Sequence, residues 1–298
     1  MLDYKLLEAL AAVVQEEGFD KAATTLHLTQ SAISHRIRTL EEQTGQTLLI
    51  RGAPPRPTPA GQKVLKHFRM VQSLESDLED VFLLRPRDGF ISLVLGINAD
   101  SLATWFLPAI RPFLDREHVL LDLLVKDQDI THQLLANGDV IGCISSKAEP
   151  PAGCTAHPLG VMTYRLMATP DFMATWFPNG LTREAATRAP AVIFNRRDGL
   201  HHAMLCSLFP EFSHAFPAHY IPSSEQFVRV IMQGHGYGLI PDLQMKKLRE
   251  ADSLAECAPG KAMPIPLFWH TWSRQSDLLA RFTSALVQGG ADVLEPMT

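Results

Sequence analysis

One N-terminal segment carries side chains suited to contact with nucleic acid. Between Thr29 and Gly45, apolar residues recur at helical spacing, and the opposite face is polar and basic. That polar face consists of Thr29, Gln30, Ser31, Ser34, His35, Arg36 and Arg38. Gln30 can form a bidentate pair with adenine, Ser34 can donate to or accept from several bases, and the two arginines suit phosphate or guanine. This chemistry predicts a recognition helix that enters the major groove of DNA.

Two further helices are predicted to position that segment. Residues 3–17 have apolar side chains at steps of three and four, which predicts an amphipathic helix ended by Gly18. Asp20 is the predicted N-cap of a short second helix, and Thr29 is the predicted N-cap of the third. A short helix, a turn and a helix with a basic outer face form the helix-turn-helix pattern. For the helix pair alone, a plain three-helix bundle with a solvated face is the alternative.

The loop that follows favours DNA binding over the plain bundle. Leu48 to Ile50 form a short β-like run, and a proline-rich loop with Arg51 and Arg56 comes directly after it. A stiff loop that carries arginines beside a recognition helix is suited to phosphate or minor-groove contact. We therefore predict a wing at this position.

Charge is distributed unevenly along the 298 residues, whose formal net charge is −5. Residues 1–70 contain nine Lys and Arg against seven acids, and between Arg36 and Arg69 the numbers are seven and two. A local basic block on an acidic chain indicates a small polyanion-binding module joined to a larger domain with another task. A less specific architectural DNA-binding protein is an alternative, but it would be expected to be basic throughout.

From Gly18 to Gly61 the chain resembles the winged helix-turn-helix of the LysR-type transcriptional regulators. The shared pieces are AAxxLHxTQSAxSxxIxxLE, the GxxLLxR lead into the wing and the TxAG that closes it. Pro57 departs from the pattern, since the family usually has an apolar residue before the wing threonine. The resemblance implies sequence-specific binding to double-stranded promoter DNA, with RNA polymerase as a further candidate partner.

A long helix is predicted over residues 58–84, with apolar residues at nearly heptad spacing. These residues are Leu65, Phe68, Val71, Leu74, Leu78 and Val81. A helix of this length spans on the order of 37 Å, and its polar flanks favour pairing with a second chain over packing on its own domain. The resemblance likewise implies dimers through this helix, and commonly tetramers. Residues 85–89, RPRDG, are the predicted hinge.

Strand and helix signals alternate after the hinge, which predicts an α/β domain with a mostly parallel sheet. We divide the chain into a winged helix-turn-helix at 1–58, a linker helix and hinge at 59–88, and an effector-binding domain at 89–298. The last has one predicted lobe at 90–160 with 265–298 and another at 161–265. The resemblance implies the same two-lobed, periplasmic-binding-protein-like arrangement with a cleft for a small molecule.

Polar residues at predicted strand ends and helix starts are the candidates for effector binding, because ligands bind at such ends in open α/β sheets. They are Asn98, Asp100, Ser101, Ser145, Ser146, Asn195, Asp198, Ser223, Ser224 and Glu225. Plain helix capping is the alternative: Asp100 or Ser101 as one N-cap, and a capping box at residues 223–226.

The segments INADSLATWFLPAI, FPNGLTR, PSSEQFV and FWH resemble the lysine- and arginine-responsive branch of the same family. The resemblance implies control of genes for basic amino-acid export or biosynthesis, with L-lysine or L-arginine as effector. Asp100, Asp198 and Glu225 suit a cationic ligand, whereas Arg196 and Arg197 would repel one. A LysR-type regulator that senses a different small molecule or the redox state is one alternative. The resemblance leaves a second, a less specific architectural protein that acts on the replication origin.

The sequence argues against catalysis, metal binding and cofactor binding. HExxH, GxSxG and P-loop patterns are absent, and the adjacent His201 and His202 would point to different faces of a helix. The four cysteines lie far apart without CxxC spacing, so we expect buried thiols and no metal site or disulfide framework.

The sequence also predicts a cytoplasmic, nucleoid-associated protein without a membrane partner. No apolar run reaches the ~18 residues that a spanning helix needs. The N-terminal residues MLDYKLLEAL lack the features of a secretory signal.

Overall fold

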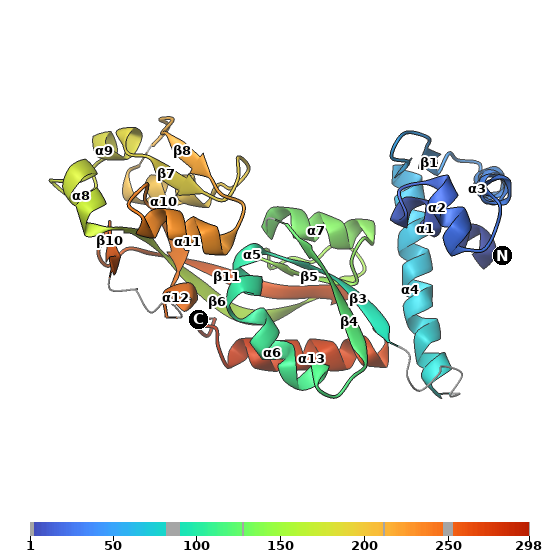
Figure 1. Cartoon of the computed structure of the whole chain (residues 1–298). Helices are drawn as coiled ribbons and strands as arrows, with labels where there is room; N and C mark the ends of the chain where they lie inside the picture. Colours follow the sequence, from blue (N-terminus) through green and yellow to red (C-terminus); the bar gives the residue numbers. More distant parts are fainter. Residues whose placement is uncertain (1–2, 82–89, 127, 211, 247–252, 298) are drawn as a thin grey trace.

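The computed structural model has an N-terminal helical unit, one long helix and a two-lobed α/β unit (Figure 1). It describes residues 3–81, 90–126, 128–210, 212–246 and 253–297. The predicted hinge at 85–89 and the end of the predicted linker helix lie outside the described residues.

The N-terminal unit is a winged helix-turn-helix. Its elements are α1 (Tyr4–Gln15), α2 (Phe19–Thr25), α3 (Gln30–Thr44), and the antiparallel wing strands β1 (Leu49–Ile50) and β2 (Arg56–Pro57). Thr29 caps α3 as predicted, because its hydroxyl accepts from the Ala32 N–H at 3.2 Å. Gly45 ends α3 in the left-handed region, at φ 65°, where glycine avoids the steric cost of a side chain.

Two of the predicted caps are wrong. Glu17 takes a φ of 53° after α1, whereas Gly18 is extended and serves as the N-cap of α2. Asp20 therefore lies in the first turn of α2, where an acidic side chain still interacts favourably with the helix dipole.

The linker helix α4 (Pro59–Val81) packs on its own domain at its N-terminal end. Leu65 and Phe68 are buried with the core of α1 and α3, so these two residues do not form the intermolecular seam that their spacing predicted. Val71 is half-buried, and the side chains of Leu74, Leu78 and Val81 lie outside the described residues. The seam's C-terminal part stays a prediction.

The effector-binding unit is built on one mixed, seven-stranded sheet. The strands are β3 (Ile91–Ile97), β4 (Val119–Val125), β5 (Gly142–Ser145), β6 (Cys154–Ala168), β9 (Gly238–Pro241), β10 (Ala255–Glu256) and β11 (Ala262–Trp272). Their order is β10-β6-β11-β5-β3-β4, with β9 also paired to β6. Among the described strands of this sheet, only the β3 pairings with β4 and β5 are parallel, so the predicted mostly parallel sheet is wrong. The long strands β6 and β11 run antiparallel along each other and make the sheet mixed.

Helices surround this sheet in two lobes (Figure 1). The first lobe carries α5 (Ala99–Thr104), α6 (Phe106–Leu114), α7 (Gln128–Asn137) and α13 (Asp277–Ala291). The second carries α8 (Pro170–Trp176), α9 (Arg183–Arg188), α10 (Leu200–Leu208), α11 (Ser224–Met232), α12 (Asp242–Met245) and the parallel strands β7 (Ala191–Ile193) and β8 (Ala218–Tyr220). The proposed lobe limits at 160/161 and 265 fall inside β6 and β11, which serve both lobes.

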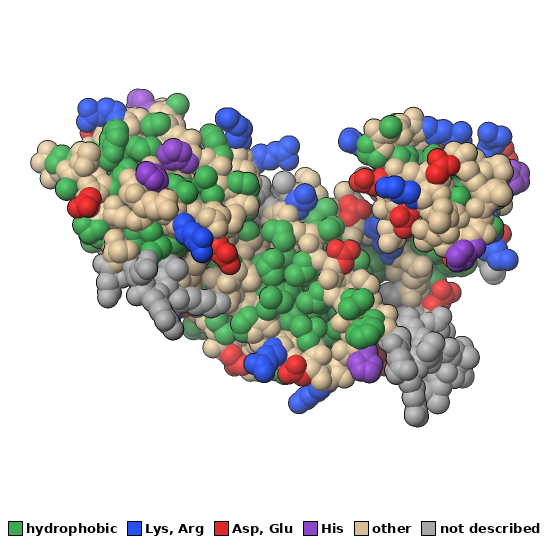
Figure 2. Space-filling model, in the orientation of Figure 1, with side chains coloured by type: hydrophobic (Ala, Val, Ile, Leu, Met, Phe, Trp, Pro, Cys, Tyr) green, Lys and Arg blue, Asp and Glu red, His purple; other side chains and the backbone are tan. Residues whose placement is uncertain are grey.

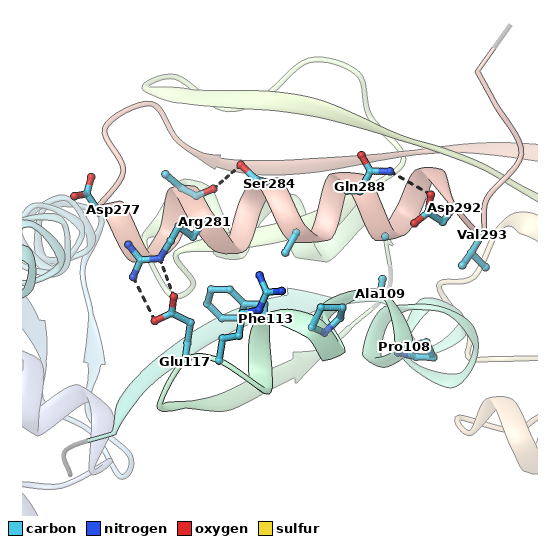
Figure 3. A pocket seen from close by; sticks show the side chains of 15 residues that line it. Pro108, Ala109, Phe113, Glu117, Asp277, Arg281, Ser284, Gln288, Asp292 and Val293 are labelled. Atoms are coloured by element: carbon cyan, nitrogen blue, oxygen red, sulfur yellow. Dashed lines mark hydrogen bonds and ion pairs between the residues drawn. The ribbon is translucent and has the colours of Figure 1, made fainter. Parts of the chain in front are cut away.

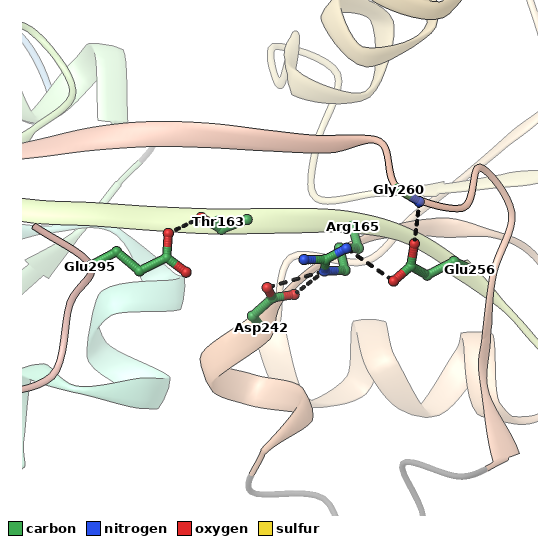
Figure 4. Close-up of polar contacts among 6 residues, drawn as sticks. All are labelled: Thr163, Arg165, Asp242, Glu256, Gly260 and Glu295. Carbon is green, nitrogen blue, oxygen red and sulfur yellow. Dashed lines mark hydrogen bonds and ion pairs between the residues drawn. The ribbon is translucent and has the colours of Figure 1, made fainter. Parts of the chain in front are cut away.

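Ion pairs fix β6 where it enters the second lobe (Figure 4). The Arg165 Nε lies 3.0 Å from the Asp242 carboxylate of α12, and its Nη1 lies 3.0 Å from the Glu256 carboxylate of β10. The Glu256 carboxylate also accepts from the Gly260 N–H at 3.1 Å. Charge-assisted pairs of this kind hold a planar guanidinium in one orientation, so they stabilise the strand that carries the neighbouring Tyr164.

In the described part of the chain, no helix is long and apolar enough to cross a membrane.

Candidate functional site

The predicted recognition face is exposed on α3. Gln30, Ser31, His35 and Arg38 are exposed, and Ser34 and Arg36 are partly exposed. The opposite side of α3 is buried through Ile33, Ile37 and Leu40. The face is thus available for a groove, as the periodicity predicted.

Three of its members also make contacts within the domain. The Arg36 guanidinium donates to the Lys5 carbonyl of α1 at 3.4 Å, and the Thr29 hydroxyl lies 3.0 Å from that of Ser31. Arg38 is the more exposed of the two arginines, so it is the better placed for a phosphate contact.

Glu41 joins the recognition helix to the wing, a role that the sequence did not reveal. Its carboxylate accepts from the backbone N–H groups of Leu48 at 2.8 Å and Leu49 at 3.3 Å. Its other oxygen lies 4.0 Å from the guanidinium of Arg51. Arg51 and Arg56 are exposed on the wing, as predicted. Since Glu41 lies on α3, it sets the position of these arginines relative to the recognition face.

A cavity of about 270 Å³ lies between the two lobes of the effector-binding unit. Four predicted residues line it: Asn98, Asp100, Ser146 and Asp198. A smaller adjoining cavity of about 40 Å³ adds Ser224 of the second lobe. The predicted strand ends therefore do meet at one cleft.

Asp100 joins the lobes at the centre of this cleft. Its carboxylate accepts from the Ser224 hydroxyl at 2.6 Å and from the Tyr164 hydroxyl at 2.9 Å. Burial raises the pKa of Asp100 above its usual value, and these two hydrogen bonds oppose that rise. Gln244 supports the arrangement, because its amide donates to the Ser224 carbonyl at 3.0 Å.

Asn98 is the buried polar group beside Asp100. It is 4% exposed, lines the cavity, and its two side-chain polar atoms have no hydrogen-bond partner among the described residues. Asn98 is also the N-cap of α5, so the predicted cap at Asp100 or Ser101 is wrong. Such unpaired buried atoms are costly, which favours a ligand in this cavity.

The loop before α10 presents a carboxylate and an arginine to the same cavity. Asp198 precedes Gly199, the N-cap of α10, and accepts from the Leu200 N–H at 2.9 Å, while the Asn195 side chain accepts from the Arg197 N–H at 2.8 Å. Arg196 lies over the Tyr220 ring, 4.5 Å from its centroid. The cavity lining contains Arg197 and not Arg196.

The remaining candidates do not line either part of the cleft. Ser101 and Ser145 are fully buried, and the Ser145 hydroxyl accepts from the Lys147 N–H. Ser223 caps α11, because its hydroxyl accepts from the Gln226 N–H at 3.4 Å. The Ser223 N–H donates to the Ile221 carbonyl, so the structure has one of the two hydrogen bonds of the predicted capping box. Asn195 fixes the turn at Arg197, and Glu225 is exposed on α11.

Sequence reasoning missed Tyr164, Lys126, Phe194 and Leu200 in the cavity lining. Tyr164 lies within β6, and Lys126 directly follows β4. A search for caps and turns does not find a strand-interior tyrosine. The signal available for Lys126 was its place at the end of a predicted parallel strand.

A second cavity, of about 740 Å³, lies apart from the cleft, between α6 and α13 (Figure 3). Pro108, Ala109 and Phe113 face it from α6, and the exposed pair of Arg281 and Glu117 closes one end at 2.8 Å. Its lining has no buried, unpaired polar side chain comparable to Asn98, so the inter-lobe cleft is the better candidate for a polar ligand.

The cysteines fit the predicted buried thiols better than a redox sensor. Cys143, Cys154 and Cys257 are buried, and Cys206 is half-buried. Burial raises the pKa of Cys143 and of Cys257 to about 12. The reactive thiolate is therefore scarce at neutral pH for both. Among the described residues, no group of three or more His, Cys, Asp or Glu side chains is placed to hold a metal.

A winged helix-turn-helix joined to a two-lobed unit with a polar cleft defines a DNA-binding regulator that responds to a small molecule. Two family models match the chain: the bacterial regulatory helix-turn-helix protein of the lysR family at residues 4–62, and the LysR substrate binding domain at residues 92–291. The chain belongs to the LysR family of transcriptional regulators.

Relatives of known name cover the whole chain. The HTH-type transcriptional regulator ArgP of Pseudomonas fluorescens strain Pf0-1 is 42% identical over 298 residues, 100% of both chains. The crystal structure of ArgP from Mycobacterium tuberculosis superimposes with a TM-score of 0.87 at 33% identity, covering 100% of both chains. Because these relatives are transcriptional regulators, the prediction that the chain is not an enzyme is confirmed.

A third relative was solved with its ligand. Full-length LysG from Corynebacterium glutamicum with bound effector Arg has a TM-score of 0.79 and 28% identity, and the match covers 99% of this chain and 100% of that one.

Proposed function

We propose that this regulator binds promoter DNA through α3 and the wing, and that L-lysine or L-arginine in the inter-lobe cleft controls that binding. The observation that carries the effector half is Asp100, a carboxylate between the lobes that lines the cleft beside unpaired Asn98. A cationic side chain would neutralise this carboxylate in surroundings where an unpaired charge is costly. The similarity to LysG, solved with arginine, supports the same class of effector.

The DNA half of the proposal assigns distinct roles to helix and wing. Gln30, Ser31 and Ser34 would read base edges, with Thr29 and His35 at the margin of the groove. The four arginines would bind phosphates or guanine: Arg36 and Arg38 from α3, and Arg51 and Arg56 from the wing. We place this activity in the cytoplasm, at the chromosome, with RNA polymerase as a further partner at the promoter.

The effector-binding unit also offers a surface for self-association into dimers and tetramers. Leu107 of α6 is 44% exposed, and Leu120 and Val125 of β4 are 54% and 39% exposed. Figure 2 shows hydrophobic side chains gathered over this region of α5, α6 and β4. An exposed apolar patch favours contact with another protein surface, which supports an oligomer alongside the linker-helix seam.

The test is calorimetric titration of the full-length protein with L-lysine and L-arginine, with L-leucine and a dicarboxylate as controls. We expect saturable binding of a basic amino acid, abolished or greatly weakened by Asp100→Asn. Glu225→Gln is the matched control, because Glu225 is an exposed acid next to Ser224 on α11. Binding of the dicarboxylate in place of both basic amino acids would overturn the proposed effector and leave the DNA-binding function untouched.

A further inference from the structure

Two cationic side chains face the inter-lobe cavity from opposite lobes. Lys126 directly follows β4 of the first lobe, and Arg197 precedes α10 of the second. Both are exposed at the mouth of the cavity, and neither forms an ion pair with any other described residue. In Figure 2, Lys and Arg side chains approach the gap between the lobes from both sides.

The loop that carries Arg197 directs it toward the cavity. Asn195 accepts from the Arg197 N–H, and Asp198 accepts from the Phe194 and Leu200 N–H groups, so both sides of the turn are hydrogen-bonded. The preceding Arg196 stacks on Tyr220 at 4.5 Å. Two consecutive arginines therefore differ in position: one packs on its own lobe, and the other lines the cleft.

The cavity is polarised along its depth. Asp100 lies inside, hydrogen-bonded to Ser224 and Tyr164, and Asn98 beside it offers one acceptor and two donors without partners. The two cations are exposed at the mouth. A ligand with a cationic end and an anionic end would be oriented by this arrangement, with its cation toward Asp100 and its anion outward.

We propose that Arg197 and Lys126 bind the α-carboxylate of the effector, one from each lobe. The inference rests on the proposed function above and assigns the outer half of the same site. The two like charges in one cavity lining repel each other, and a carboxylate between them would interact favourably with both.

The test compares L-arginine with agmatine, which keeps the guanidinium and lacks the carboxylate. Both are titrated into the full-length protein and into Arg197→Gln, Lys126→Gln and Arg196→Gln. We expect agmatine to bind wild type at least about tenfold more weakly than L-arginine. Arg197→Gln and Lys126→Gln should each weaken L-arginine by about tenfold and leave agmatine unchanged or slightly tighter. The matched control Arg196→Gln should change neither.

Equal affinities of wild type for L-arginine and agmatine would overturn the carboxylate site while leaving a cation-binding cleft. The same conclusion follows if Arg197→Gln and Arg196→Gln bind L-arginine alike. L-Norleucine, which keeps the α-carboxylate and lacks the side-chain cation, separates the two proposals. If only L-norleucine binds, and Arg197→Gln weakens it, the basic effector is wrong and the carboxylate site holds. If none of these amino acids binds, both proposals are wrong.

Discussion

Replacement of Glu41 tests whether the wing is positioned by the recognition helix. Its carboxylate accepts from the N–H groups of Leu48 and Leu49, whose residues are 1% and 2% exposed. Hydrogen bonds to a charged acceptor contribute about 1.5–3 kcal/mol, and the longer 3.3 Å bond contributes less. Glu41→Ala should therefore destabilise the attachment of the wing by about 2–4 kcal/mol, because it leaves two buried donors unpaired.

Two measurements follow from this magnitude. Hydrogen exchange at the Leu48 and Leu49 amides should accelerate by a factor of about 30 to 1,000, in proportion to the lost free energy. Affinity for promoter DNA should fall, and the slope of log K against log salt should become shallower by up to about 1.8 if the Arg51 and Arg56 phosphate contacts are both lost. Glu41→Gln, which keeps one acceptor oxygen, should lie between wild type and Glu41→Ala.

The direction of the change in DNA affinity distinguishes a loss of wing position from a loss of negative charge. Removal of an acid near DNA should by itself strengthen binding, because it reduces repulsion of the phosphates. Glu42→Ala is the control for charge alone, since Glu42 is exposed and next in sequence. If Glu41→Ala tightens DNA binding as Glu42→Ala does, and the two amides exchange at wild-type rates, Glu41 has no positioning role.

Three further predictions concern the DNA face, pH and the linker. Gln30→Ala should relax base choice at one position of the binding site. Arg38→Ala should instead weaken binding to specific and random DNA alike and reduce the slope of log K against log salt by about 1. If binding-site selection shows the same loss of base preference for both variants, the two residues do not have these separate roles. Burial lowers the pKa of His201 to about 3, from an ordinary value of 6.5. As pH falls below ~6.5, the unfolded chain takes up a proton on this histidine and the folded protein does not, so the free energy of unfolding decreases. Denaturant unfolding of His201→Phe should show less acid sensitivity between pH 6.5 and pH 4, and an unchanged pH profile would refute this. The Arg69 guanidinium of α4 donates to the Gly138 carbonyl and lies 3.4 Å from the Asp139 carboxylate after α7. Arg69→Ala should therefore reduce the change in DNA affinity that the effector causes, as measured by DNA titrations with and without effector. An unaltered change in affinity would show that this contact does not connect the effector-binding unit to the DNA-binding unit.

Local sequence was sufficient to predict the DNA-binding module. α3 begins after Thr29 and ends at Gly45, as the sequence predicted. Both a capping hydroxyl and a left-handed glycine depend on residues only a few positions away in the chain. The exposed face of α3 follows from helical periodicity alone. The shifted cap at Gly18 is a small error of the same kind, since Glu17 took the left-handed conformation that glycine usually takes.

The spacing of the linker residues left two outcomes open. A heptad-like stripe can face a second helix or the helix's own domain, and the sequence has no signal that separates them. In the folded structure, Leu65 and Phe68 are buried in the core of the DNA-binding domain, because apolar residues of α1 and α3 pack in the same cluster. The direction of strands is equally invisible to periodicity, which is why the antiparallel pair β6 and β11 was not foreseen.

The chain by itself determined the family, the recognition helix and the polar strand ends from which the cleft is built. Only the tertiary structure decided which of those polar groups act together. Asp100 is hydrogen-bonded to Tyr164 and Ser224, which are 64 and 124 residues away in the sequence. The consecutive residues Arg196 and Arg197 differ in position, because Arg196 packs on the Tyr220 ring and Arg197 lines the cavity. The physical reason is range: caps and helical faces depend on neighbours in sequence, whereas the desolvation and charge of a cleft depend on groups that only folding brings together.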